Sequence, residues 1–410
     1  MSGRARANGE GSIFPYRNGF AAYAWVVRPD GRRMRKYVYG KTREIVHEKW
    51  IKLQQDAKQG PMTSTDMTVA DYMTYWLEEV IKPNKAPLTY ATYETFIRLY
   101  IVPGLGAEKL SRLQVQPRKV QKWLNAVAAT CQCCAQGKDA ARHPERRRCC
   151  ALERPECCEN LLSPRSLSDI RTCFRSALSN AIDDELITKN VAKSIKLPTV
   201  RKPKRKRWTS EQARQFLESA RSDCDPFYAA YVLVLVMAMR KGEVLGLLVD
   251  AVDLDAGELG IEHQLQRVRR QLLHRETKTE ASDDTLPLPG IASTALSQRL
   301  ARRDRDREQA GEAWQEFGLM FCTRYGTPIE PRNFNRAWDA RCRKAEVPKI
   351  SVHDGRRTCG SLLADLDVHP RVAMRILRHA QFAVTMEIYT EVSSEATQAG
   401  LKRLGESLER

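Results

Sequence analysis

The pattern of apolar and polar positions predicts a sheet at the start of the chain. Three short runs rich in aromatic and β-branched residues are separated by the turn signals RNG and PDG. A segment with helical periodicity follows, with Thr42 in position to cap it. We therefore expect a three-stranded β-sheet and one helix within residues 1–62.

The next part of the chain is predicted to be helical. Within residues 65–198, four segments repeat apolar residues with a period near 3.6. The last begins with Ser163 as a helix cap and Pro164 at the first helical position. These features predict a four-helix unit, interrupted at 131–158 by a stretch rich in cysteine.

A capping box formed by Thr209 and Gln212 opens the last part of the chain, residues 208–410. Helical periodicity dominates there, so we expect a mixed α+β domain. Its strands are expected in 258–278 and 283–289, joined by a polar turn into one small sheet.

The longest apolar run, Phe227–Met239, has thirteen residues. It predicts a buried helix, because a membrane-spanning helix needs about 20 apolar residues. The first dozen residues contain no apolar segment of the kind found in secretory signals. We therefore expect a cytoplasmic protein with no membrane partner.

Charge favours nucleic acid as a partner. The chain has 68 Lys+Arg against 50 Asp+Glu, a formal charge of +18, which suits a polyanion, although solubility alone can account for a basic composition. A three-stranded sheet can lie in a DNA major groove, and the other interpretation is a small basic domain that binds something else. The basic segment 201–208 is either a solvated linker or a contact with DNA phosphates, and both can hold. The candidate DNA contacts are Arg17, Arg28, Arg33, Arg35 and Lys36 in the sheet, and Lys204, Arg205 and Lys206 in the segment.

Several residues of the last part could bind an anion. Arg240 ends the long apolar run, and a buried guanidinium must meet a carboxylate or a ligand anion. A structural pair with Glu243 is at least as good an explanation as phosphate binding. His353 and Arg356 are three residues apart, so on a helix they share a face and can converge on one anion.

Three further positions complete the candidate chemistry. Lys278 approaches the turn of the predicted hairpin, and His379 and Tyr389 stand ten residues apart near the C-terminus. A phenol has an unperturbed pKa near ~10, so its attack on phosphorus requires cations that stabilise phenolate and phosphate together.

The order and spacing of these residues resemble the tyrosine recombinase (phage integrase) family. The resemblance covers about 65 to 395, and the N-terminal sheet is similar to the arm-binding domain of integrases from phages and integrative elements. With its cysteine-rich insertion, the chain resembles integrases of actinobacterial mobile elements. The resemblance implies a multidomain, mainly α protein, with an arm-type DNA-binding domain at 1–62, a SAM-like core-binding domain at 65–198 and a catalytic domain at 208–410.

The resemblance also implies a mechanism. Tyr389 would attack the scissile phosphate, giving a 3′-phosphotyrosyl DNA and a free 5′-hydroxyl. The other roles are phosphate binding by Arg240, Arg356, His353 and His379, proton removal by His353, protonation of the leaving oxygen by Lys278, and orientation by Glu243. Re-ligation needs no ATP, no G-x-x-x-x-G-K-[ST] loop is present, and no catalytic cofactor is implied. Expected partners are double-stranded DNA with core and arm sites, three further copies in a homotetramer, and an excisionase.

The chain departs from the family pattern at three positions. Arg378 stands where a glycine usually precedes the last histidine, and Ala238 stands where glycine is common. Gly355 replaces the usual leucine of H-x-L-R. We expect these differences to affect local packing or DNA contact, since they leave the six catalytic-type side chains intact.

The cysteine-rich stretch holds seven of the twelve cysteines. Such a loop is stabilised by disulfides or by zinc, and in the cytosol we favour a structural zinc ion over unpaired thiols. Seven thiolates exceed the four that one ion needs, so the ligand set is ambiguous. Our expected set is Cys131, Cys134, Cys150 and Cys157.

Other functions compete with an integrase. A recombinase that resolves chromosome dimers and a type IB topoisomerase share the chemistry, but simple resolving enzymes lack an arm-binding sheet. A DNA-binding regulator on an inactive catalytic domain would not need all six side chains. A C-terminal stripe of Leu401, Leu404 and Leu408 could dock on a neighbouring copy or pack on its own chain.

Overall fold

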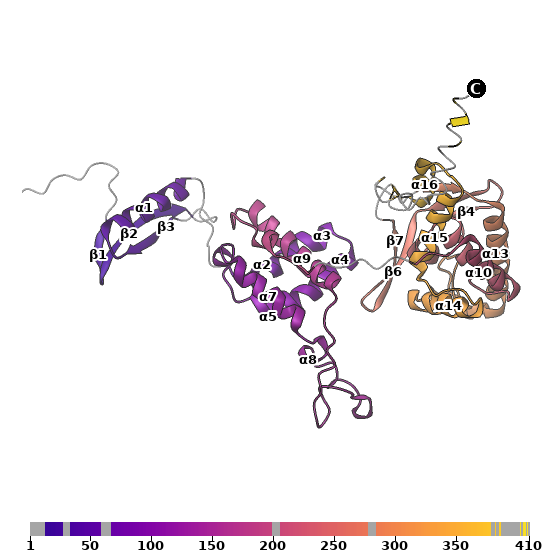
Figure 1. Cartoon of the computed structure of the whole chain (residues 1–410), viewed down its shortest axis with the longest axis horizontal. Helices are drawn as coiled ribbons and strands as arrows, with labels where there is room; N and C mark the ends of the chain where they lie inside the picture. Colours follow the sequence, from indigo (N-terminus) through magenta and orange to yellow (C-terminus); the bar gives the residue numbers. More distant parts are fainter. Residues whose placement is uncertain are drawn as a thin grey trace, which may run out of the picture. The chain divides into compact units, whose positions relative to one another are not determined.

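The computed structural model describes residues 13–27, 33–58, 67–198, 206–277 and 284–378. Isolated positions beyond these are also described, namely 382, 385–386, 402, 405–406 and 408. Contacts divide the chain into two units, Met1–Arg201 and Lys202–Arg410 (Figure 1). Within the described residues, no helix has the length and apolar character needed to cross a membrane.

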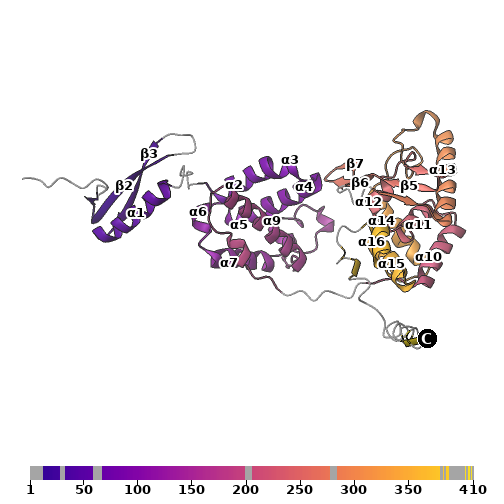
Figure 2. The same ribbon diagram turned by 90° about the horizontal axis from the view of Figure 1, so that it is seen from above.

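The predicted N-terminal sheet with its helix is confirmed. Strands β1 (Phe14–Tyr16), β2 (Gly19–Val27) and β3 (Arg33–Gly40) pair antiparallel in that order. Helix α1 (Arg43–Lys58) lies against one face of the sheet (Figure 2). Thr42 is its cap, since its hydroxyl accepts the N–H of Ile45 at 3.4 Å. Alternate strand residues bury against the helix, which is why the opposite face remains open.

The four predicted helices of the middle segment are also confirmed. The first two each contain a π-helical stretch, where the hydrogen-bond ladder widens. Ser163 caps the last helix by accepting the N–H of Ser166 at 3.1 Å, as its sequence predicted. The helices are α2–η1–α3 (Val69–Tyr75, Trp76–Ile81, Lys82–Asn84), α4–η2–α5 (Pro87–Phe96, Ile97–Ile101, Val102–Leu105), α7 (Pro117–Ala129) and α9 (Pro164–Asp183), with the short α6 (Leu110–Leu113) and η4 (Val191–Ser194).

Buried aromatic residues join these helices into one core. Trp76 and Phe174 are fully buried, and Trp123 packs edge-on against Phe174 with ring centroids 5.6 Å apart. The Tyr72 hydroxyl donates to the carbonyl of Ala177 at 3.2 Å, so a polar atom in this core is satisfied. The cysteine-rich insertion leaves this core after α7 and returns to it at α9.

The second unit is built around helix α11 (Tyr228–Leu235), in which every residue from Ala229 to Leu235 is buried. Its apolar character on all sides matches its position between α10, α13 and α15. The helices that surround or follow it are α10 (Ser210–Ser222), α12 (Lys241–Leu245), α13 (Gly290–Ala310), η6 (Gly311–Ala313), α14 (Pro331–Lys344), α15 (Val352–Asp365) and α16 (Pro370–Leu377). Thr209 and Gln212 form the expected capping box at α10.

The prediction of a single sheet in this unit is wrong. Strands β4 (Val252–Asp253), β5 (Glu258–Ile261) and β8 (Asp284–Pro287) form one antiparallel sheet. Strands β6 (His263–Val268) and β7 (Gln271–Glu276) form a separate hairpin. The chain changes partner at Glu262, between β5 and β6, which a uniform pattern of alternating residues does not signal. Figures 1 and 2 place this hairpin and α13 on opposite sides of the unit.

The apolar run Phe227–Met239 is helical only as far as Leu235. Ala238 has a φ of 52°, a left-handed conformation that no continuing helix allows. The prediction of one helix over the run is therefore wrong at its C-terminal end. The turn has a consequence for the site, because it places Arg240 at the N-cap of α12 instead of at the C-terminal end of a buried helix.

Candidate functional site

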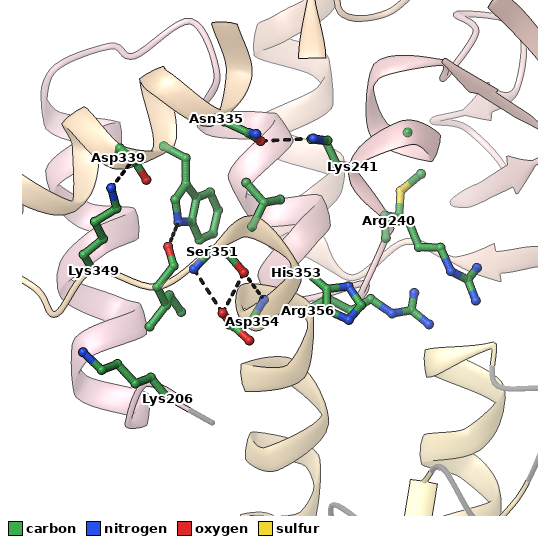
Figure 3. Close-up of a pocket in the computed structure, with 15 residues that line it drawn as sticks. Lys206, Arg240, Lys241, Asn335, Asp339, Lys349, Ser351, His353, Asp354 and Arg356 are labelled. Atoms are coloured by element: carbon green, nitrogen blue, oxygen red, sulfur yellow. Dashed lines mark hydrogen bonds and ion pairs between the residues drawn. The ribbon is translucent and has the colours of Figure 1, made fainter. Parts of the chain in front are cut away.

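A cleft of about 920 Å³ opens in the second unit between the α11–α12 turn, α14 and the start of α15. Figure 3 shows the Arg240 and Arg356 guanidinium groups side by side, with the His353 ring next to them. The basic side chains that line the cleft are Lys206, Arg240, Lys241, Lys349, His353 and Arg356. The cleft is therefore suited to an anion.

Glu243 holds Arg240 in place. Its carboxylate accepts the backbone N–H of Arg240 at 2.8 Å and the Arg240 Nη1 at 2.6 Å. The Arg240 side chain is 40% exposed whereas Glu243 is 3% exposed. The structural pair and the anion site are thus compatible, because the carboxylate anchors the guanidinium from behind and leaves it facing the cleft.

Arg356 is held by backbone carbonyls. Its Nη1 donates to the carbonyl of Ala238 and its Nη2 to the carbonyl of Leu377. Burial, the nearby cation Arg240 and the cation Arg378 lower the pKa of Arg356 to about 9, although Glu243 opposes the shift. The group still carries its charge at neutral pH, in a place where water does not stabilise it.

Arg378 adds a third cation that sequence reasoning did not assign to the site. It ends α16 in a left-handed conformation, with φ 47° and ψ 53°. Its fully buried side chain donates to Glu243 at 2.7 Å, and its carbonyl accepts from Arg240 at 3.3 Å. The signal in the sequence was its position, since glycine, which adopts this conformation without strain, is usual there.

Cations gather at the base of the cleft. Among the described residues, three guanidinium groups, those of Arg240, Arg356 and Arg378, lie around the carboxylate of Glu243. A bound dianion or the two non-bridging oxygens of a phosphodiester would meet complementary donors there.

His353 enters the cleft from the first turn of α15. Ser351 caps this helix by accepting the N–H of Asp354 at 3.2 Å, and Asp354 completes the capping box. His353 and Arg356 therefore lie on one helix, as predicted from their spacing. The first residues of α15, from Ser351 to Asp354, also line the cleft.

The structure thus brings together four of the predicted site residues, namely Arg240, Glu243, His353 and Arg356. Lysine 206 of the basic segment also lines the cleft. The remaining candidates Lys278, His379 and Tyr389, with Arg28, Lys204 and Arg205, lie outside the described residues. Lys241, which sequence reasoning missed, lines the cleft and donates to Asn335 at 3.2 Å.

The close approach of the Trp338 ring to the backbone at position 355 explains why glycine stands there in place of the leucine of the family pattern. A Cβ at Gly355 would meet the ring of Trp338 at 2.8 Å and Val234 at 3.2 Å. Trp338 is fixed by stacking on Trp208, with ring centroids 5.6 Å apart, and by its N–H bond to Ile350 at 2.9 Å. The tryptophan thus takes the space that a leucine would fill.

The open face of the N-terminal sheet combines aromatic and basic side chains. Trp25 pairs with Arg35 across β2 and β3, and Tyr23 pairs with Tyr37. The Arg35 guanidinium lies 4.8 Å from the Trp25 ring centroid and 4.9 Å from that of Tyr23. Alternation along the strand puts Lys36 on the other face, with the residues that pack on α1. Among the described residues of the sheet, this open face is the part suited to a groove of DNA.

The seven cysteines of the insertion gather their sulfur atoms in one place. Cys131, Cys134 and Cys157 form one group, and Cys133, Cys149 and Cys158 form another. Within each group the sulfurs lie within 4.8 Å of one another. The sulfur of the expected ligand Cys150 is 3.9 Å from those of Cys133 and Cys149, and Cys150 also interacts with Cys134 of the first group.

Backbone groups favour thiolate at one of these positions. N–H groups of Cys134, Cys133 and Asn160, opposed by burial, lower the pKa of Cys131 to about 6. The Cys157 sulfur accepts the N–H of Glu159 at 3.4 Å. Burial and neighbouring thiols raise the pKa of Cys133, Cys134, Cys149 and Cys158, so the case for a thiophilic metal ion depends on how closely the sulfurs lie together.

Comparison with protein families gives two matches. Residues 206–396 match the phage integrase family, and residues 68–128 match the SAM-like N-terminal domain of phage integrases. An integrase from Streptomyces ambofaciens is 27% identical over 385 residues, covering 91% of this chain and 89% of its own. A XerC-like tyrosine recombinase of Caldanaerobacter subterraneus is 22% identical, covering 88% of this chain and 89% of its own.

A solved structure shares the fold. The Tn1549 transposon integrase, in complex with a circular intermediate DNA, aligns with a TM-score of 0.61 and 19% identity. The alignment covers 82% of this chain and 99% of that one. With its helical N-terminal match, its catalytic-domain match and its arginine-lined cleft, the chain belongs to the phage integrase family of tyrosine-type site-specific recombinases.

Proposed function

We propose that this protein cleaves and rejoins DNA through a 3′-phosphotyrosyl intermediate, in order to integrate and excise a mobile element. The observation that carries the proposal is the pair of guanidinium groups, Arg240 and Arg356, which lie side by side and are held by the Glu243 carboxylate and the Ala238 carbonyl. Charge on the phosphate oxygens grows in the transition state, and donors fixed beforehand stabilise it without reorganisation.

The family pattern supplies the reacting groups. The Tyr389 oxygen attacks phosphorus and the bond from phosphorus to the 5′-oxygen breaks. His353 accepts the phenol proton, and Lys278 gives a proton to the departing 5′-oxygen, so the 5′-end leaves as a hydroxyl. Arg240, Arg356 and His379 bind the phosphate, while Glu243 orients Arg240. Rejoining is the reverse reaction and needs neither ATP nor a catalytic cofactor.

A covalent-trapping experiment tests this proposal. The protein is incubated with a nicked duplex that carries its core site, so that the strand released by cleavage diffuses away. A protein–DNA adduct should survive denaturing electrophoresis for the wild type and should be missing for Tyr389→Phe, while both proteins shift the intact site. Binding without any adduct from the wild type would favour the alternative, a DNA-binding regulator on an inactive catalytic domain.

The open sheet face supports a role for residues 1–62 in binding arm-type sites. Arg35 and Trp25 stack on that face, where a cation and aromatic rings can contact phosphates and the groove. Arg35→Ala should weaken binding to arm DNA and reduce its salt dependence, since one phosphate contact is lost. Lys36→Ala is the matched control on the adjacent residue of the opposite face, and an equal loss in both variants would contradict this assignment.

The remaining parts of the proposal follow the family. Residues 65–198 contact the core site, residues 208–410 carry the chemistry, and four copies assemble on two DNA partners with an excisionase controlling direction. The arm-type sheet favours an integrase over a recombinase that resolves dimers. The protein acts on DNA in the cytoplasm. A structural zinc ion at Cys131, Cys134 and Cys157, with one further cysteine, holds the insertion.

A further inference from the structure

The sulfur atoms of the insertion form one continuous cluster. The two groups of three are joined through Cys131 and Cys158, whose sulfurs lie 3.8 Å apart. The seventh, Cys150, extends the second group. All residues of 131–158 are described, so the cluster accounts for every cysteine in the insertion.

The spacing of these sulfurs is that of a zinc–thiolate site. Four sulfurs at about 2.3 Å from a tetrahedral zinc ion are about 3.8 Å from one another. The contacts measured here are 3.5 Å for Cys133–Cys149, 3.8 Å for Cys134–Cys157 and Cys131–Cys158, and 3.9 Å for the two contacts of Cys150. A disulfide would place two sulfurs about 2.05 Å apart. These five contacts thus have the edge length of a tetrahedron around zinc, and the other edges of the two groups of three lie within 4.8 Å.

Ligand number then decides how many ions fit. One zinc ion takes four thiolates, and two separate ions would take eight. Two tetrahedra that share one corner take seven, which is the number present. Two members touch both sides. Cys150 contacts Cys133 and Cys149 and also interacts with Cys134. Cys158 contacts Cys131 at 3.8 Å and belongs to the group of Cys133 and Cys149, so we take Cys158 as the shared ligand.

We propose that the insertion binds two zinc ions in a seven-thiolate cluster with Cys158 as the shared ligand. The first ion is held by Cys131, Cys134, Cys157 and Cys158, and the second by Cys133, Cys149, Cys150 and Cys158. This extends the single-zinc proposal made above and is independent of the proposed DNA chemistry.

The surroundings of the cluster favour thiolates as its complete ligand set. Asp139 is close to Cys149 and Cys150, but its buried carboxylate already accepts N–H groups of Cys149 at 3.0 Å and Ala151 at 3.1 Å. It also pairs with Arg142 at 2.6 Å. The carboxylate therefore shapes the loop that presents two of the cysteines, as a supporting residue behind a metal ligand does.

The insertion also has very little apolar core to hold its fold. Its buried apolar cluster consists of Cys131, Cys133 and Cys149 with Cys150 packed against them. Regular structure in it is limited to two short helices, α8 (Gln132–Ala135) and η3 (Pro144–Arg146). A segment of this size without an apolar core needs metal ions or disulfides to hold one conformation. The two ions would take the place of the core.

Metal content of the full-length protein tests the proposal. The protein is purified with a reductant and without chelator, and its metals are measured by inductively coupled plasma mass spectrometry and by native mass spectrometry. We expect two zinc ions per chain. One zinc ion would overturn this inference and leave the single-zinc proposal intact, whereas no metal, or iron with sulfide, would overturn both.

X-ray absorption at the zinc edge tests the shared ligand on the wild-type protein, so it does not depend on a variant that folds. All-sulfur coordination and a zinc–zinc distance of about 3.8 Å are expected for two tetrahedra joined at one corner. A zinc ion coordinated by nitrogen or oxygen atoms, with no second zinc ion nearby, would refute the cluster. Cys158→Ser should lower the zinc content, while Cys173→Ser, at a buried cysteine in the core of the helical unit, should retain two ions.

Discussion

Replacing Glu243 by glutamine should destabilise the catalytic unit by about 3–5 kcal/mol, the cost of breaking a buried ion pair. The carboxylate is 3% exposed, and it binds the fully buried side chain of Arg378 at 2.7 Å and Arg240 at 2.6 Å. Glutamine retains the shape and an acceptor oxygen. It removes the negative charge that the Arg240 and Arg378 guanidinium groups contact, so these cations and Arg356 repel one another more strongly.

An ion pair on the surface with the same contact distance provides the control. Glu211 binds Arg214 at 2.6 Å, the same distance as Arg240 and Glu243, but the Glu211 side chain is 66% exposed. Water and salt screen that pair, so Glu211→Gln should change stability by less than the error of measurement. The contrast between the two variants isolates burial as the cause.

Hydrogen exchange followed by mass spectrometry is the assay, since it reports opening free energies for single segments of a multidomain chain. Peptides from α11 and α15 should lose protection in Glu243→Gln and not in Glu211→Gln. Sulfate should restore more protection than chloride at equal ionic strength, because a divalent anion can occupy the cleft. Equal protection in both variants, or equal effects of both salts, would refute the charge argument.

Three other outcomes are expected. Gly355→Ala should lower the free energy of unfolding by about 1–3 kcal/mol, because the added Cβ is forced against Trp338. Gly290→Ala, where a Cβ meets nothing within 4 Å, should not lower it. Urea unfolding measures both, and equal effects would contradict the packing explanation. Arg378→Gly should be more stable than Arg378→Ala by about 1 kcal/mol, because only glycine adopts the left-handed cap without strain, and an equal stability in thermal melts would argue against that strain. Asp223 bonds to basic side chains of α14, which lower the pKa of its carboxyl group. Its contribution to the free energy of unfolding is therefore present above the unfolded pKa and is lost as pH falls through the folded pKa. Asp223→Asn should flatten the acid side of the curve of stability against pH, and an unchanged curve would show that the pair does not contribute.

Local patterns predicted the elements of the fold well. The caps Thr42, Ser163 and Thr209 and the helical periods of the middle segment depend on residues within one or two turns, so they are visible in the sequence. The spacing of His353 and Arg356 likewise places both on one helix. Errors arose where a neighbour distant in sequence decides, as at the change of strand partner after β5 and at the left-handed turn of Ala238.

The sequence by itself determined the kinds of chemistry available: arginines near apolar runs, a histidine one turn before an arginine, and seven thiols in a short insertion. Only the tertiary structure decided how these groups are held. Arg356 is oriented by a carbonyl 118 positions away, and Glu243 is shared with a cation 135 positions away. The division of the cysteines into two joined groups is likewise a property of the folded loop. Such contacts depend on which segments the core brings together, and no periodicity within a single segment encodes them.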